Sequence, residues 1–191
     1  MNHPVLGDGP VARGVLVITI ACLYAGAVSI NNNLIFSWLE FDDFRNLMFL
    51  PAGLKLFLVM LFGWRAVAGI AVGIAATALA EFPHVSMASA LLLGGAAALS
   101  TQLALALMSR LLNVGFPWAE MSWPKLCAIA LVVGCLDALT VQCAMALLGY
   151  ETFENFLSDT VQGAFGRVAG TFVFLSMALE VRRRLSAMPQ P

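Results

Sequence analysis

Charged residues are scarce in this sequence, and their scarcity excludes most classes of soluble protein. Only 11% of the 191 residues are charged, whereas 61% are hydrophobic. A soluble domain has about 25% charged and about 45–50% apolar residues. The few lysines and arginines form no basic patch with interleaved aromatic residues, so we expect no nucleic-acid partner. The composition is that of a membrane protein whose first partner is the lipid bilayer.

Metal-binding and catalytic motifs are missing as well. Histidine occurs only at His3 and His84, which argues against a histidine-based metal site or catalytic triad. The four cysteines lie inside apolar runs without a CxxC or Cys/His arrangement, as small core residues do. The sequence supports no catalytic activity, and we expect neither a metal nor a cofactor.

Long apolar runs predict an all-α, polytopic transmembrane bundle. A helix needs about 20 apolar residues to cross the hydrocarbon layer, and it satisfies its backbone hydrogen bonds internally. We expect one integral membrane domain over residues 1–191, whose first helix is a retained, uncleaved anchor. The bundle has about six crossings, roughly at residues 14–30, 46–62, 66–80, 85–108, 126–148 and 161–179.

Residues 31–45 separate the first two of these crossings and combine aromatic with acidic side chains. Trp38 and Phe41 lie beside Glu40, Asp42 and Asp43. Aromatic rings are enriched at the level of the lipid headgroups. We therefore expect a short helix lying in the membrane interface.

Basic residues are concentrated on one side of the predicted crossings. That side receives Arg13, Arg65, Arg110, Lys125 and the cluster Arg182, Arg183 and Arg184. The opposite side receives Arg45 together with most of the acidic residues. Because short loops rich in lysine and arginine remain cytoplasmic, we expect both termini inside. The predicted location is the bacterial inner membrane, with a multi-pass topology.

Three ionisable side chains lie well inside the predicted crossings, namely Lys55, Asp137 and Arg167. A charge at such depth is unfavourable by about 2.5–17 kcal/mol, depending on the scale, unless it is paired or lines a wet cavity. Lys55 and Asp137 fall at similar depth, so we expect them to pair, which leaves one positive charge over.

The leftover charge has more than one interpretation. In the first, the Lys55–Asp137 pair only fixes two helices against each other, and Arg167 reaches Asp159 or the outer headgroups. In the second, the charge faces a cavity open to the outer side and attracts a small anionic ligand. A proton path through the buried carboxylate is a third. Candidate neutral groups for such a cavity are Gln102, Thr140, Gln142 and Gln162.

Small residues predict the places where helices approach closely. Gly69 and Gly73 stand at GxxxG spacing in the third crossing, where we expect packing within the chain rather than dimerisation. Gly166 and Gly170 are the corresponding candidates in the sixth crossing.

Part of the sequence resembles a known family. Pro51 and Gly53 open an apolar helix, Gly63, Trp64 and Arg65 form a turn, and Gly69, Ile70 and Gly73 follow. With the stretch 159–170, this pattern resembles the MASE1 group of bacterial membrane-associated sensor domains. The kinase or cyclic-dinucleotide domain that follows such domains is not in this sequence. The resemblance therefore implies a sensory or ligand-binding module that signals through a separate membrane or cytoplasmic partner.

Two other functions stay open beside the sensory module. The size and helix count are similar to those of the substrate-binding subunits of energy-coupling-factor transporters. Ala21 and Ala25 match the AxxxA spacing by which the first helix of those subunits docks its partner. The chain can also be a membrane scaffold in which the buried charges only fix the helix register.

Overall fold

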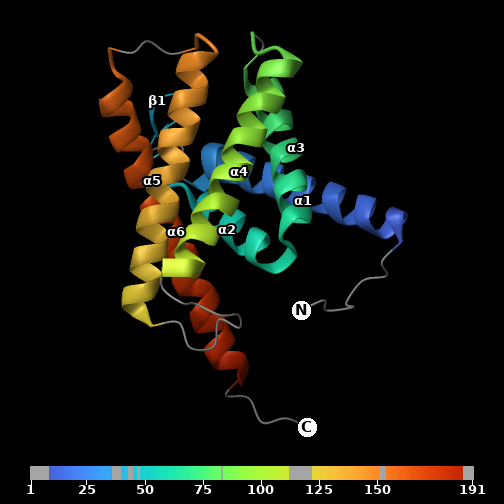
Figure 1. Cartoon of the computed structure of the whole chain (residues 1–191), viewed down its shortest axis with the longest axis vertical. Helices are drawn as coiled ribbons and strands as arrows, with labels where there is room; N and C mark the ends of the chain where they lie inside the picture. The colour runs from blue at the N-terminus through green and yellow to red at the C-terminus, as the bar shows by residue number, and fades with distance from the viewer. Residues whose placement is uncertain are drawn as a thin grey trace.

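The computed structural model describes residues 9–35, 40–42, 45–46, 48–82, 84–111, 122–150 and 154–186. Over these residues the fold is a bundle of six α-helices with one short pair of strands (Figure 1). The helices are α1 (Pro10–Ile30), α2 (Leu50–Phe62), α3 (Trp64–Glu81), α4 (Met87–Leu111), α5 (Trp123–Leu147) and α6 (Phe156–Ser186).

Five of these helices, all except α2, are long and apolar enough to cross a membrane. The chain is therefore a membrane-embedded, multi-pass protein, and the expectation of an all-α bundle is confirmed. The number of six crossings and the orientation of the termini stay predictions.

Helix α2 is short because residues at both ends limit it. Pro51 lies in its first turn, where the missing N–H has no intrahelical partner to lose. Gly63 ends it with a φ of 56°, a left-handed conformation that favours glycine, and α3 begins at the next residue. The 13 residues of α2 rise over about 20 Å, which is less than the hydrocarbon thickness.

The expectation of an interfacial helix over residues 31–45 is wrong for the described part of that segment. Asn31–Ile35 continue α1 as a π-helical turn, η1. β1 (Glu40–Asp42) then pairs antiparallel with β2 (Arg45–Asn46). The run of three asparagines has low helix propensity, and a strand pair reverses the chain in fewer residues than a helix needs.

Three apolar clusters hold the described bundle together, and α2 and α4 contribute to the two larger ones. The first core includes Tyr24 of α1, Leu58 of α2, Ile70 of α3 and Ala98 of α4. The second includes Leu56 of α2, Ala104 of α4, Val133 of α5 and Leu175 of α6. The short α2 accordingly lies in the middle of the bundle, between the α1 and α3 pair and the α5 and α6 pair (Figure 1).

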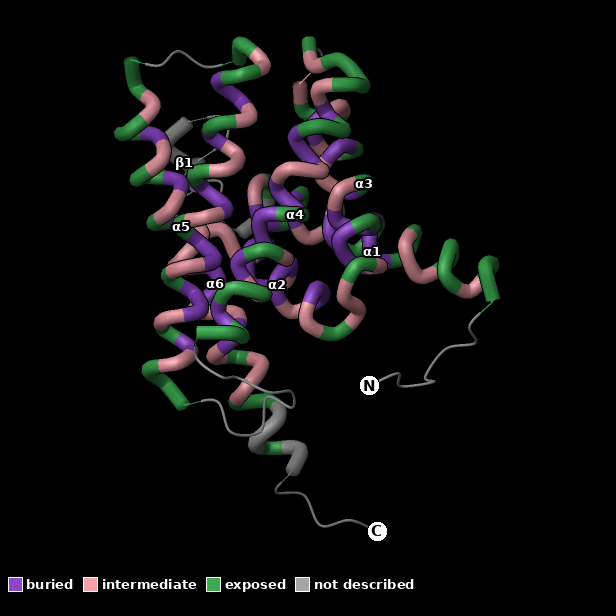
Figure 2. Tube along the Cα trace, viewed as in Figure 1, coloured by how far each residue is buried: buried purple, intermediate pink, exposed green. Residues whose placement is uncertain are grey.

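Glycines let α1 pack directly on α3. A Cβ at Gly69 would lie 2.7 Å from Ile20 Cγ2, and one at Gly73 would lie 2.8 Å from the carbonyl oxygen of Ala21. The GxxxG pair is thus used within the chain, as expected. Only the carboxyl-terminal half of α1 is packed in this way, and its amino-terminal half projects from the bundle (Figure 2).

The ends of the helices carry different charges. The end of α3 and the starts of α4 and α6 lie towards one end of the bundle, where Glu81 and Asp159 are found (Figure 1). The start of α3, the end of α4 and the start of α5 lie towards the other end, with Arg65, Arg110 and Lys125. These three basic residues are therefore separated from Glu81 and Asp159, as the sequence predicts.

Adjacent glycines of α4 give a matched test of close packing. A Cβ at Gly94 would lie 2.2 Å from the carbonyl oxygen of Ala71, whereas a Cβ at Gly95 meets no atom within 4 Å. Gly94→Ala should lower the free energy of unfolding by about 1–3 kcal/mol, because α3 and α4 must separate. Gly95→Ala should leave it unchanged or raise it by up to about 1 kcal/mol. Titration with SDS in mixed micelles measures both, and equal effects would contradict the packing.

Candidate functional site

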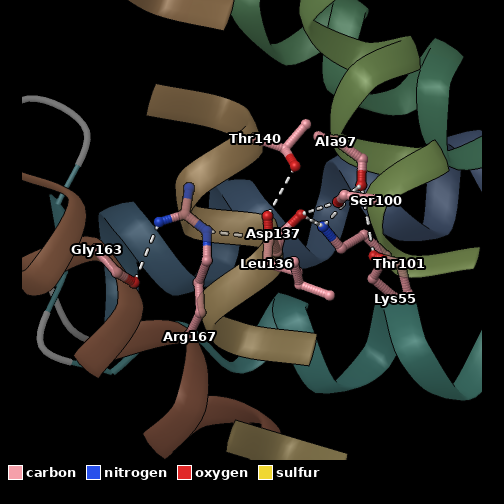
Figure 3. A network of polar contacts seen from close by, with 9 residues as sticks. All are labelled: Lys55, Ala97, Ser100, Thr101, Leu136, Asp137, Thr140, Gly163 and Arg167. Atoms are coloured by element: carbon pink, nitrogen blue, oxygen red, sulfur yellow. Dashed lines mark hydrogen bonds and ion pairs between the residues drawn. The ribbon is translucent and has the colours of Figure 1, made fainter. Parts of the chain in front are cut away.

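The carboxylate of Asp137, on α5, is the centre of a buried polar cluster that connects four helices (Figure 3). Its Oδ1 accepts hydrogen bonds from Lys55 Nζ of α2 and, at 2.9 Å, from Ser100 Oγ of α4. Its Oδ2 accepts a hydrogen bond from Arg167 Nε of α6 at 3.0 Å. Three donors from three other helices therefore satisfy one carboxylate.

Lys55 is enclosed completely. Its side chain and that of Asp137 are 2% and 3% exposed, and its ammonium group also donates to the carbonyl oxygen of Ala97 at 3.2 Å. A buried pair of this kind contributes to stability mainly because removal of either partner strands the other charge. The predicted pairing of Lys55 with Asp137 is confirmed.

Arg167 has a more exposed side chain than Lys55 and Asp137. Its side chain is 16% exposed. Nε is bound by Asp137, and Nη1 donates to the carbonyl oxygen of Gly163 at 3.2 Å. These are two of the five N–H donors of a guanidinium group. The third nitrogen points away from both acceptors (Figure 3).

The position of Arg167 differs from the first interpretation of the sequence. That interpretation sends the guanidinium towards Asp159 or the headgroups, but in the structure it shares the carboxylate of Asp137 with Lys55. The reason is geometric. A Cβ at Gly134 would lie 2.8 Å from the backbone nitrogen of Val168, so α5 and α6 approach closely just beside Asp137 and Arg167.

The cluster carries one net positive charge, since it holds two cations and one carboxylate. Asp137 lies ten residues before the end of α5, about 15 Å along the helix axis. A partly exposed guanidinium group inside an apolar helix is unfavourable against acyl chains and stable against water, an anion or a polar group of a partner.

None of the predicted neutral side chains donates one of the described hydrogen bonds to Asp137. Gln162 is exposed and donates to Ser158 on its own helix at 3.3 Å. Gln102 has a buried Oε1 that accepts no hydrogen bond from the described residues. Gln142 is buried on α5, but five residues after Asp137 it faces a different side of the helix. Thr140 donates to the carbonyl oxygen of Leu136 on α5.

Two side chains outside the predicted set contact the cluster, beside the backbone carbonyls of Ala97 and Gly163. They are Ser100, which binds Asp137, and Phe49, whose ring lies under the guanidinium group of Arg167. A signal for Ser100 exists in the sequence, because it is a polar residue in the middle of an apolar helix. Phe49 has no such signal, since aromatic residues are ordinary in membrane proteins.

The candidate glycines of α6 face the chain segment that leads into α2. The carbonyl oxygen of Gly166 accepts a hydrogen bond from the N–H of Phe49 at 3.0 Å. A Cβ at Gly170 would lie 2.1 Å from the carbonyl oxygen of Phe49. On α2, a Cβ at Gly53 would lie 2.4 Å from Phe174 Cβ. Gly53, one of the glycines that carry the family resemblance, therefore lies against α6, whereas Gly69 and Gly73 lie against α1.

Comparison of the chain with protein-family models, with curated proteins and with solved structures found no match.

The ratio of two cations to one carboxylate predicts which charged side chain contributes most to stability. Asp137→Asn leaves two buried cations facing each other, so the free energy of unfolding should fall by about 3–5 kcal/mol. Lys55→Met should lower it less, because a neutral Asp137–Arg167 pair remains. Unfolding in SDS, followed by circular dichroism, measures both.

The matched control is Glu180→Gln, which removes an exposed carboxylate that pairs with Arg184 on α6. An exposed pair contributes about 0.2–1 kcal/mol, so this variant should change stability little. A Lys55→Met protein that is less stable than Asp137→Asn would contradict the shared carboxylate.

Proposed function

We propose that this chain is a sensory or ligand-binding module of the bacterial inner membrane, which binds a small anionic group at Arg167 and signals through a separate partner protein. The observation that carries the proposal is the difference in burial between the charged side chains of the cluster. Lys55 and Asp137 are sealed, whereas the excess positive charge is on the side chain that stays partly exposed.

The members of the cluster have different roles in this proposal. Lys55 and Asp137 hold α2 against α5 and keep the local charge fixed. Arg167 presents its remaining N–H donors to the ligand. A carboxylate or a phosphate has two oxygens at the spacing of two parallel N–H groups, so it can bind a guanidinium edge in a bidentate manner.

The sensory role rests on the resemblance of Pro51, Gly53 and the Gly63–Arg65 turn to MASE1 domains. The excess of basic residues at one end of the helices supports a cytoplasmic location for that end and an inner-membrane orientation with both termini inside. A signal would reach the partner through a change in the helix contacts that meet at Asp137, because this carboxylate connects four helices.

A membrane scaffold is the second candidate, and the near-complete burial of Lys55 and Asp137 favours it. In a scaffold, a polar group of another membrane protein would cover the exposed edge of Arg167. The transporter subunit stays an alternative, in which Ala25 rather than Ala21 would dock the partner, because Ala21 packs against Gly73 within the chain.

Native mass spectrometry of the protein, released gently from its own membranes, tests the proposal. The wild-type chain should carry a small anionic mass that Arg167→Ala loses, with affinity lower by at least about tenfold, the effect of one charged hydrogen bond. The matched control is Arg184→Ala, which removes the same charge at an exposed site far along α6 and should keep the bound mass.

The identity of the bound mass decides between sources of the anion. A soluble carboxylate or phosphate would support the sensor, and an anionic phospholipid lost in Arg167→Ala would place a headgroup at the same site. A chain that carries only lipid unaffected by Arg167→Ala, or a ligand-free complex with another membrane protein, would overturn the anion site in favour of the scaffold.

A further inference from the structure

The guanidinium group of Arg167 lies over the ring of Phe49. The Cζ atom of Arg167 lies 5.8 Å from the ring centroid, within the range of a cation–π interaction. Phe49 is the residue immediately before α2, so it lies outside the helix that carries Lys55. The aromatic contact thus comes from a separate short segment of the chain.

The backbone of that segment is held by hydrogen bonds to α6 and to the end of α1. Phe49 donates its N–H to the carbonyl oxygen of Gly166 on α6, at 3.0 Å. The next N–H, that of Leu50, donates to Oδ1 of the buried Asn31 at the end of α1, at 3.1 Å. The backbone of Phe49 also lies directly on Gly170, where a Cβ would clash. The ring is therefore held in place by α1 and α6 together.

The edges of the guanidinium group are held by other atoms. Asp137 binds Nε, the carbonyl oxygen of Gly163 binds Nη1, and Gly163 leaves room for that nitrogen, since a Cβ there would lie 2.8 Å from it. The ring of Phe49 restricts the guanidinium group on one side, and the two acceptors hold two of its nitrogens. Nη2 remains for a ligand.

We infer that Phe49 is a positioning residue of the anion site, whose ring holds the Arg167 guanidinium group in place for a ligand. The inference rests on the proposed anion-binding function and makes it more specific. Because Asp137 and Gly163 hold Nε and Nη1, the remaining N–H groups of Arg167 favour an oxyanion, such as a carboxylate or phosphate group.

The first experiment titrates the full chain in detergent micelles with inorganic phosphate, followed by isothermal titration calorimetry. Phe49→Leu should bind phosphate about three- to thirtyfold more weakly, the range of a lost cation–π contact. Phe49→Tyr keeps an aromatic ring and should bind like the wild type. Phe57→Leu is the matched control, because Phe57 is on α2 and packs on Phe174, with ring centroids 6.0 Å apart.

The second experiment needs no ligand. The Nε–Hε resonance of Arg167 in the nuclear magnetic resonance spectrum should be shifted by the ring current of Phe49. The shift should disappear in Phe49→Leu and persist in Phe57→Leu. If Phe49→Leu does not fold, Phe49→Met offers a longer non-aromatic side chain for both experiments.

The two measurements separate the possible failures. Phosphate affinity that is equal in wild type and Phe49→Leu would overturn the positioning role and leave the anion site intact. An unchanged Arg167 resonance in Phe49→Leu would also overturn it. A wild-type chain that binds no phosphate, although its Arg167 resonance responds to Phe49→Leu, would overturn the anion site itself.

Discussion

The carboxylate of Asp137 is the interaction on which the bundle depends. It accepts hydrogen bonds from α2, α4 and α6, and it compensates two cations that would otherwise be strongly unfavourable in an apolar medium. Because all three donors must reach two oxygen atoms, the rotation and depth of four helices are coupled to one another. Few single contacts in a helical membrane protein constrain so many elements, since association of helices in lipid has little hydrophobic driving force.

Close backbone contacts make this convergence possible. Gly134 allows α6 to approach α5, Gly94 allows α4 to approach α3, and Gly73 allows α3 to approach α1. Each of these glycines replaces a side chain that would separate the helices by several ångströms. The short α2 then fits between the two groups of helices, and it carries Lys55 to the level of Asp137 although it is too short to be counted among the spanning helices.

An excess of positive charge distinguishes this cluster from a one-to-one ion pair. A one-to-one pair would be electrically neutral, and the burial of Lys55 is enough to predict such a pair from the sequence. The second cation changes the effect of a double substitution. Removal of both Lys55 and Asp137 would leave Arg167 without its carboxylate. The orientation of the partly exposed Arg167 side chain depends on its neighbours, Gly163 and Phe49.

The sequence by itself determined the helical membrane class, the approximate bounds of most helices, and the need of Lys55 for an opposite charge. These are local properties, because hydrophobic run length and the unfavourable burial of a charge depend on each segment alone. Only the tertiary structure decided that Arg167 shares Asp137, that Ser100 joins it, that Gln162 does not, and that the guanidinium group lies over the ring of Phe49. Contacts between helices depend on their rotation, depth and separation, which are set by all the packed surfaces together rather than by any one segment.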